Sequence, residues 1–528
     1  MKLNYKRIIF VGFAFFLISA FWQAYDTIIP KILTDKFGLP QAWSGAIMAL
    51  DNIFALILLP IFGAISDKVS SRFGRRTPFI VIGAITAAVL LISLSIPDNA
   101  QLSNIKSVSA TQGEAYTEAL ETIWEENPKV NDWRSDSIFS EKQPLQDLIT
   151  REAFTAIPFE IEQDAKTVTN PAYSNIVVPA RQAYAARMTA KNVTPLVLFM
   201  VLLFFTLVAM GTFRSPAVAL MPDVTVKPLR SKANAIINLM GTAGGILVLL
   251  LGKIFATGSA KNALMSYTTF FAIVAGIMMV GLAVFLWKVR EPQWAAEMQA
   301  ESARLGLDAP AEDESEQTEV RTLSKGEKIS LLLILASVVF WFMGYNAVTS
   351  KYSVYASSVL NVDYNTTLLI AQAAAIVAYL PVGILSSKLG RKKMILGGVV
   401  ILGISFFFAS FLSADSPDLV KQLLMPLLFA LAGIGWATIN VNSYPMVVEL
   451  SRGSNVGKYT GFYYTASMSA QVVTPILSGV FLDMNFRTLF PYATVFVALA
   501  FITMLFVRHG DAKPDAKQVA LDAMGGDD

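Results

Sequence analysis

The fold of this 528-residue chain is decided by a stretch that reads Gly63-Ala64-Ile65-Ser66-Asp67-Lys68-Val69-Ser70-Ser71-Arg72-Phe73-Gly74-Arg75-Arg76-Thr77-Pro78-Phe79-Ile80. It joins two apolar runs, at about 43–66 and 78–97, and each run is long enough to cross a bilayer. Four basic residues and a single acid lie between these runs. Short loops rich in Lys and Arg stay on the cytoplasmic side of a membrane. The stretch therefore predicts a tight cytoplasmic turn between two transmembrane helices.

A second copy of this turn follows about 320 residues later. Residues 383–393 repeat the small residue, the serine and the Gly-Arg-basic ending of the first turn. Residues 21–26 (Phe-Trp-Gln-Ala-Tyr-Asp) match residues 340–346 (Phe-Trp-Phe-Met-Gly-Tyr-Asn) with one residue inserted. A third match pairs two further helix ends, Pro222-Asp223 and Val448-Glu449 with Arg452. Three matches in the same order predict two homologous halves, an arrangement typical of secondary transporters.

The composition indicates a membrane protein. Hydrophobic residues make up 54% of the chain and charged residues 15%, whereas a soluble domain has roughly 25% charged residues. The net charge of +3 gives no sign of nucleic-acid binding. The absence of cysteine excludes disulfides, thiol catalysis and thiolate metal sites, and His509, the only histidine, lies at the end of the last apolar run. No nucleotide-binding motif or catalytic triad occurs, so we expect no enzyme activity, no cofactor and no metal.

We predict an all-α membrane protein with twelve transmembrane helices in two pseudo-symmetric six-helix bundles. The predicted spans are about 8–30, 43–66, 78–97, 194–221, 233–256, 264–287, 329–350, 365–386, 394–413, 422–447, 459–482 and 489–507. The first run is too long for a cleavable signal peptide and lacks a small-residue cleavage site. Basic residues concentrate in alternate loops, which predicts cytoplasmic termini and insertion in a plasma or inner membrane.

Two long segments interrupt the twelve spans. Residues 98–193 form an extracellular insertion between the third and fourth helices, and a short helix is expected at 113–127. We favour a small folded cap over a disordered segment, and its role (substrate filter, partner site or decoration) stays open. The resulting division is an N-terminal bundle (1–97 and 194–287), the insertion (98–193), a cytoplasmic linker (288–328), a C-terminal bundle (329–508) and a cytoplasmic tail (509–528).

Three ionisable residues lie well inside predicted spans: Asp26, Asp51 and Arg214. Such residues cost about 2.5–3.5 kcal/mol each on insertion scales, so they mark functional sites. A buried carboxylate can take up a proton or coordinate sodium, and we assign ion coupling to Asp26 and Asp51. The alternative is a local pair or contact with an aqueous vestibule. Counting residues from the outer helix ends puts Arg214 well below Asp51, which argues against a direct pair.

Uncharged polar residues recur at helical spacing on several spans. Amides and hydroxyls beside Trp and Tyr rings suit neutral sugars, although such stripes can also join helices to one another. The predicted substrate-binding residues are Trp22, Gln23, Arg214, Asn234, Asn238, Trp341, Asn346, Gln372, Trp436, Asn440, Tyr464 and Gln471. A separate set of charges at cytoplasmic helix ends predicts an inner gate of ion pairs: Asp67, Arg72, Arg75, Arg76, Asp223, Arg391, Glu449 and Arg452.

The arrangement resembles the major facilitator superfamily. Within it, residues 63–80 are similar to the signature of plant sucrose/proton symporters and their animal and bacterial relatives, a likeness that extends to glycoside-pentoside-hexuronide:cation symporters. Residues 215–223 and 233–235 resemble the fourth and fifth helices of the sucrose carriers. The resemblance implies glycoside uptake driven by a cation, usually H⁺. The helix-four Asp of those carriers falls here near Leu207, whereas Asp51 is placed more like the second-helix carboxylates of melibiose-type symporters.

These observations predict a carrier that imports a sugar or glycoside with H⁺ or Na⁺ by alternating access and works as a monomer. Two alternatives stay open. Arg214 would hold an anionic sugar such as a uronate or sulfosugar in the first. The second is a non-transporting membrane sugar sensor, with residues 98–193 as the ligand domain and 288–328 as the output.

Overall fold

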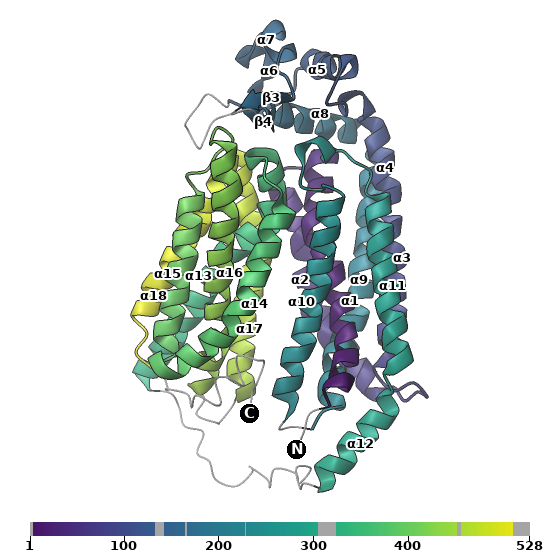
Figure 1. Ribbon diagram of the computed structural model, residues 1–528, viewed down its shortest axis with the longest axis vertical. Coiled ribbons are helices and arrows are strands. Elements are labelled where there is room, and N and C mark those ends of the chain that lie inside the picture. Colours follow the sequence, from purple (N-terminus) through teal and green to yellow (C-terminus); the bar gives the residue numbers. More distant parts are fainter. Residues whose placement is uncertain are drawn as a thin grey trace.

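The computed structural model describes residues 4–132, 142–163, 166–226, 229–304, 324–450 and 456–509, and Figure 1 shows their arrangement. Long helices dominate both halves of the chain. Those of the N-terminal half are α1 (Tyr5–Lys31, continued by the π-helical turn Ile32–Lys36), α2 (Gln41–Lys68), α3 (Thr77–Ser93) with α4 (Ser95–Asn104), α9 (Thr194–Asp223), α10 (Arg230–Ile254) and α11 (Thr268–Lys288). Those of the C-terminal half are α13 (Lys325–Tyr355, continued by the π-helical turn Ala356–Leu360), α14 (Tyr364–Leu389), α15 (Arg391–Ala409), α16 (Asp418–Glu449), α17 (Val456–Met484) and α18 (Leu489–Leu505).

Eleven helical segments among the described residues are long and apolar enough to cross a membrane. The 26-residue helix α14 occupies the position of the remaining predicted span. The all-α membrane fold is therefore confirmed. The first and seventh spans extend further than predicted, because π-helical turns carry them on to Lys36 and Leu360. The third continues through α4 to Asn104 rather than ending near residue 97.

The two halves repeat one packing scheme. In the N-terminal half, α1 packs on α10 and α11, while α3 packs on α9 and α11. In the C-terminal half, α13 packs in the same way on α17 and α18, while α15 packs on α16 and α18. The halves meet along α2 with α17, α10 with α14, and α1 with α13. This correspondence of neighbours confirms the internal repeat found in the sequence.

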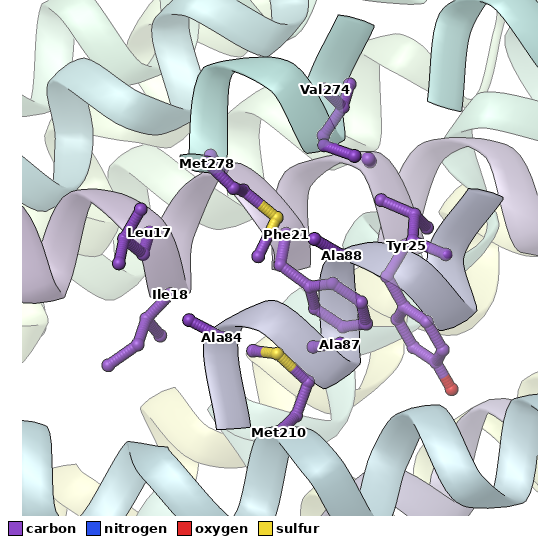
Figure 2. Close-up of a cluster of buried hydrophobic side chains, with 14 of the residues drawn as sticks. Leu17, Ile18, Phe21, Tyr25, Ala84, Ala87, Ala88, Met210, Val274 and Met278 are labelled. Carbon is purple, nitrogen blue, oxygen red and sulfur yellow. The ribbon is translucent and has the colours of Figure 1, made fainter. Parts of the chain in front are cut away.

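Small residues let the helices of each half approach closely. Figure 2 shows Phe21 and Tyr25 of α1 beside Ala84, Ala87 and Ala88 of α3. All five side chains are at most 3% exposed. Lipid tails are as apolar as leucine, so helix association in a membrane depends on such close packing rather than on a hydrophobic driving force. The C-terminal half has a separate hydrophobic core of its own, built from α13, α15, α16 and α18.

The insertion between α4 and α9 lies at one end of the molecule, opposite the helix α12 (Glu291–Arg304), as Figure 1 shows. Its elements are η2 (Lys106–Val108), α5 (Glu114–Glu126), β1 (Lys129–Asn131), β2 (Lys142–Pro144), α6 (Leu145–Leu148), α7 (Arg151–Thr155), β3 (Glu160–Gln163), β4 (Lys166–Thr169), η3 (Tyr173–Val177) and α8 (Val178–Lys191). The remaining short helices are η5 (Ala260–Asn262) and η7 (Phe486–Thr488). The expected helix at 113–127 is α5, whereas the two antiparallel hairpins β1–β2 and β3–β4 were not predicted. The insertion has its own buried core, which includes Tyr116, Phe154 and Tyr173.

Candidate functional site

A small cavity lies between α1, α2 and α9, in the interior of the N-terminal half. Its lining includes Trp22, Asp51 and Arg214, together with the apolar residues Phe54, Ala55, Leu59, Leu207 and Gly211. The cavity has a volume of about 10 Å³, close to the room that one water molecule or one small ion requires. Leu207, which stands where the resemblance implies an aspartate in the sucrose carriers, therefore lines the same cavity as Asp51.

Asp51 and Arg214 line this cavity, and Asp26 lies outside its lining. Arg214 interacts electrostatically with both Asp51 and Asp26. One Asp51 oxygen accepts hydrogen bonds from the Asn52 backbone N–H at 2.6 Å and from its side-chain amide at 2.7 Å. The Arg214 Cζ atom lies 5.6 Å from the centroid of the Trp22 ring, within reach of a cation–π contact. With both carboxylates ionised, the group carries one net negative charge.

The side chain of Arg214 reaches the cavity from below. The backbone of α9 is level with the lower part of α2, because Gly211 packs against Leu58 and Ser215 against Gly63. Side chains on a helix tilt toward its N-terminus, so the long Arg214 side chain extends back toward Asp51. The depth count along the helices was thus correct for the backbone. The count did not include the length and direction of the Arg214 side chain. In the described part of the chain, no ion pair within 4.0 Å joins Arg214 to either carboxylate.

Asp26 faces the space between the halves. It is exposed, although it lies inside a membrane-spanning helix. It shares a face of α1 with Gln23, whose side-chain oxygen accepts a 2.7 Å hydrogen bond from the amide of Gln372 on α14. Gly245 of α10 lies beside both amides, and a Cβ atom there would be 3.5 Å from Gln23 and 3.6 Å from Gln372. The predicted residues Gln23 and Gln372 thus meet across the two halves.

The other predicted substrate residues lie at several depths. In the C-terminal half, the Trp436 ring stacks on Tyr345 with centroids 3.8 Å apart, and the Asn346 amide nitrogen is buried without a partner among the described residues. Asn238 and Asn440 are exposed, and Asn440 lies beside Tyr379. Tyr464 is half-exposed and lies against Tyr444, while Gln471 donates to the backbone oxygen of Ser467. The side chain of Asn234 lies outside the described part.

The expectation for Trp341 needs correction. Its side chain is fully buried in the hydrophobic core of the C-terminal half, packed with Ile334 and Val338. The match with Trp22 placed Trp341 on the equivalent helix, but the two rings differ in burial, since Trp22 is partly exposed and lines the small cavity. A ring enclosed by its own bundle offers no surface to a substrate.

The end that carries the insertion is closed by two lysines that the sequence analysis missed. Both Lys31 of α1 and Lys351 of α13 are fully buried, and one inserted residue makes them equivalent in the two halves. Lys31 donates to the Thr257 backbone oxygen at 2.9 Å and to the Ser357 hydroxyl, which belongs to the other half, at 3.0 Å. Lys351 donates across the halves to the Gln41 backbone oxygen at 2.6 Å. The predicted spans stopped at residues 30 and 350, so both lysines were counted as helix ends.

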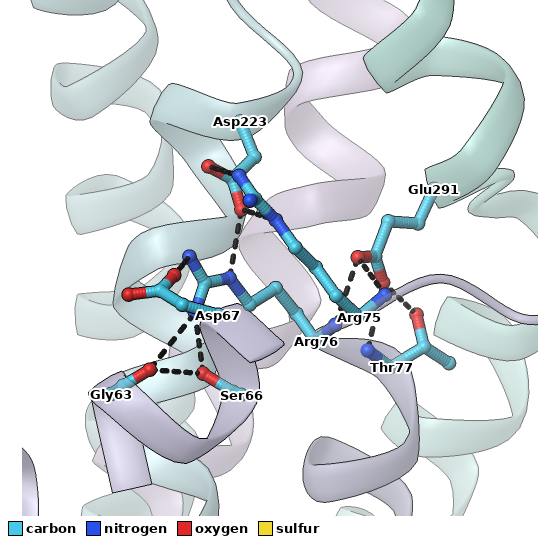
Figure 3. Close-up of polar contacts among 8 residues, drawn as sticks. All are labelled: Gly63, Ser66, Asp67, Arg75, Arg76, Thr77, Asp223 and Glu291. Carbon is cyan, nitrogen blue, oxygen red and sulfur yellow. Dashed lines mark hydrogen bonds and ion pairs between the residues drawn. The ribbon is translucent and has the colours of Figure 1, made fainter. Parts of the chain in front are cut away.

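The opposite end carries an ion-pair network within the N-terminal half, shown in Figure 3. The Arg76 guanidinium bonds Asp223 at 2.8 Å and also binds Asp67 and the Ser66 hydroxyl. Arg75 forms a two-pronged contact with Asp223 at 2.6 and 3.1 Å. Both contacts to Asp223 tie the loop before α3 to the end of α9. The predicted gate residues Asp67, Arg75, Arg76 and Asp223 are thus brought together.

Other predicted gate residues do not join this network. Arg72 is exposed and lies over the Phe73 ring at 4.6 Å, so its predicted role is corrected. Arg391 is buried at the start of α15 in the other half. The side chain of Glu449 and the whole of Arg452 lie outside the described residues.

Glu291 at the start of α12 completes the network and was not predicted. Its carboxylate accepts from the backbone N–H groups of Arg75, Arg76 and Thr77 at 2.7–2.8 Å, and from the Thr77 hydroxyl at 2.7 Å. It thereby caps the positive end of α3. Gly74 has a φ of +106°, and a Cβ atom there would lie 2.2 Å from the Glu291 side chain. The sequence signal for this cap was the pair Glu291-Pro292, a few residues after the end of the sixth predicted span.

The twelve-helix fold and the polar site beside its central interface define the class of protein, a polytopic membrane transporter rather than an enzyme. A profile of the Major Facilitator Superfamily matches residues 180–379 and 362–523, and the chain belongs to that superfamily. A second profile, for MFS/sugar transport proteins, matches residues 10–110.

Comparison with individual proteins gives shorter matches. The chain is 34% identical to the human proton-associated sugar transporter A over 93 residues, which is 18% of this chain and 12% of that protein. It is 37% identical to the Arabidopsis thaliana sucrose transport protein SUC4 over 54 residues, 10% of this chain and 11% of that protein. Each match therefore covers only a small part of the relative. In structure, the chain is similar to the partially occluded, inward open xylose transporter XylE from E. coli, with a TM-score of 0.54 and 14% identity over 96% of this chain and 98% of the other.

Proposed function

We propose that this chain is a secondary active carrier that takes up a sugar or glycoside together with H⁺ or Na⁺. The observation that carries the proposal is a cavity large enough for one water or ion, lined by Asp51 and Arg214, with Asp26 close enough to interact electrostatically with Arg214. The names of the matched relatives, a proton-associated sugar transporter and a sucrose transporter, support the same substrate class.

Charge balance explains how an ion would be coupled. One arginine offsets one of the two carboxylates, which leaves a negative charge inside a membrane-spanning bundle. A proton or Na⁺ that binds at Asp51 neutralises the group and lowers the cost of moving the site through an occluded state. Asp26 faces the space between the halves. Its carboxylate would link ion binding in the cavity to binding of a sugar in that space. Gln23 and Gln372 would donate and accept hydrogen bonds to sugar hydroxyls, and Trp436 would offer a ring face.

The contacts between the halves suggest where this site opens. Cross-half hydrogen bonds between described residues lie at the insertion end and at Gln23–Gln372, which is about 12 Å further down α1 from Lys31. We therefore assign the structure to a state closed at the insertion end, and alternating access would open that end by rocking the halves. With the termini cytoplasmic, the insertion end faces outward, and an inward ion gradient would drive uptake through it.

Replacement of Asp51 tests the coupling. Asp51→Asn keeps the shape of the site but fixes it as neutral. We expect it to abolish uphill accumulation of the sugar in proteoliposomes with an imposed ion gradient, while exchange between equal sugar pools continues. Asp51→Glu restores a carboxylate and should keep part of the accumulation. If Asp51→Asn accumulates sugar as the unmodified chain does, Asp51 does not couple the ion.

A second candidate substrate is an anionic sugar. Arg214 is not joined to either carboxylate by an ion pair within the described residues, so a widening of its cavity of about 10 Å³ would let the guanidinium bind a uronate or sulfosugar. Competition between neutral and anionic sugars separates the two candidates. If only anionic sugars compete, and Arg214→Gln removes that competition, the second candidate is correct.

A further inference from the structure

A long apolar groove runs along the C-terminal half, away from the transport site. Its walls are α14 and α15 and its floor is α16. The groove has a volume of about 810 Å³, and its lining includes Val377, Pro381 and Leu385 on α14 and Gly397 and Ile401 on α15. From Ile370 to Leu389 it spans about 28 Å of helix, close to the ~30 Å thickness of a hydrocarbon core. An acyl chain from one leaflet covers about half of that thickness, so the groove is long enough to hold one lengthwise.

The groove faces lipid rather than the other half. Gln372 marks the side of α14 that meets the N-terminal half. At 100° per residue, Val377 and Pro381 lie about 140° and 180° round the helix from Gln372. Val377 is 73% exposed, and a Cβ atom at Gly397 would meet nothing within 4 Å. In a membrane-spanning chain, this open side is in contact with the acyl chains of the bilayer.

One end of the groove is positively charged. Lys393 lines it, is exposed, and makes no hydrogen bond or ion pair with another residue in the described ranges. Its neighbour Lys392 is engaged differently, because its ammonium group donates to the Leu505 and Val507 backbone oxygens at 2.9 and 2.7 Å. Lys393 stands near the start of α15, at the end of the molecule opposite the insertion, where lipid headgroups lie.

We propose that this groove binds one anionic glycerophospholipid, with an acyl chain along α14 and α15 and the phosphate at Lys393. Charge complementarity selects the anionic headgroup, since the groove is otherwise apolar. The lipid is a ligand of the fold and not a transported substrate. The site lies on the opposite side of α14 from Gln372, so the proposal does not depend on the sugar or the coupling ion.

The test is native mass spectrometry of protein extracted from vesicles of phosphatidylcholine with a minor fraction of phosphatidylglycerol. We expect one phosphatidylglycerol retained per chain. Lys393→Gln should lower its retention about fivefold, the effect of one lysine near an anionic headgroup. Lys328→Gln is the matched control, because Lys328 is also exposed at the same end, on α13, and does not line the groove.

A second pair of variants tests the acyl-chain channel. Gly397→Leu fills the groove and should abolish retention of phosphatidylglycerol. Gly276→Leu on α11 adds the same side chain at another position where a Cβ would meet nothing within 4 Å, and should leave retention unchanged. The proposal is overturned if phosphatidylcholine is retained as well as phosphatidylglycerol, or if either test variant behaves like its control. Asp51→Asn should not change lipid retention, so failure here and failure of the proposed transport function are distinguishable.

Discussion

At the scale of single residues, the Arg76 side chain joins α2 and α9 at the end opposite the insertion. This side chain is 4% exposed and bonds residues on α2 and α9, whereas the Arg75 side chain is 42% exposed and, among the described residues, bonds Asp223 alone. A planar guanidinium can serve several acceptors at once, and a lysine ammonium at the same position has neither the fork nor the reach. Arg76 therefore contributes more to the stability of the fold than its neighbour Arg75.

We expect Arg76→Lys to lower the free energy of unfolding by about 2 kcal/mol, because a lysine keeps the charge but cannot bond Asp223, Asp67 and the buried Ser66 hydroxyl at once. Arg75→Lys, at a partly exposed pair, should cost about 1 kcal/mol or less. Thermal unfolding in detergent micelles measures both. Arg72→Lys is the control and should leave the melting temperature unchanged. Equal losses for Arg75→Lys and Arg76→Lys would contradict this ranking.

The chemistry of the candidate site was predictable, but its geometry was not. Asp26, Asp51 and Arg214 were identified because charges inside apolar runs are rare. Helical counting gave the depth of each Cα atom. It did not give the rotation of each helix relative to its neighbours, which decides which side chains face one cavity, nor the direction of the Arg214 side chain. Glu291 was missed because its partners are backbone N–H groups, which leave no pattern of paired charges in a sequence.

At the scale of the elements, the first helix of each half has a buried lysine near the insertion end. The spans themselves were predictable from apolar runs of about 20 residues. Their ends were not, because α1 and α13 continue beyond Lys31 and Lys351 into π-helical turns. A prediction that stops each span at a lysine therefore treats a buried contact as a surface residue.

We expect Lys351→Met to open the insertion end. The methionine cannot donate the hydrogen bond from α13 to Gln41, so the Gln41 carbonyl oxygen loses its Lys351 partner. Ser44 is fully buried at the start of α2, and the chain has no native cysteine, so Ser44→Cys provides a specific reporter. Labelling by a membrane-impermeant maleimide should be slow in the Ser44→Cys background and several-fold faster with Lys351→Met. Lys421→Met is the matched control, because Lys421 is also buried but its partners in the described ranges, Ala414 and Asp418, belong to its own half. Faster labelling with both variants would point to general loosening instead.

The contact between α2 and α17 depends on glycine. A Cβ atom at Gly45 would lie 1.8 Å from the Pro475 backbone oxygen, so Gly45→Ala forces the two helices apart. We expect this change to disfavour closure and to expose a thiol placed at Ser353, which is 2% exposed. Gly461→Ala on α17 is the control, because a Cβ there would meet nothing within 4 Å. Protection of the thiol in the Gly45→Ala variant would show that the helices can adjust.

At the scale of the whole molecule, the insertion belongs to the N-terminal half in sequence but contacts both halves. The Asn131 amide donates to the Asp483 and Met484 backbone oxygens of the C-terminal half at 3.2 and 3.1 Å. In return, the Asn361 amide donates to the Ser174 hydroxyl at 2.7 Å. These bonds form only when the two halves are close together at this end. The insertion therefore stabilises the closed arrangement of the insertion end.

We expect Asn131→Ala to shift the balance of states by about 1 kcal/mol, roughly fivefold in population, which is the net value of such hydrogen bonds. Rocking of two rigid halves closes one end as the other opens. Spin labels at Phe73→Cys and Lys328→Cys, both exposed at the end opposite the insertion, should then report a larger share of short distances. Asn170→Ala removes an amide bond to Pro158 inside the insertion and leaves the bonds between the halves intact, so its distances should match those of the unmodified chain. A shift of the same size in both variants would mean that folding of the insertion, and not its contact with the C-terminal half, sets the balance.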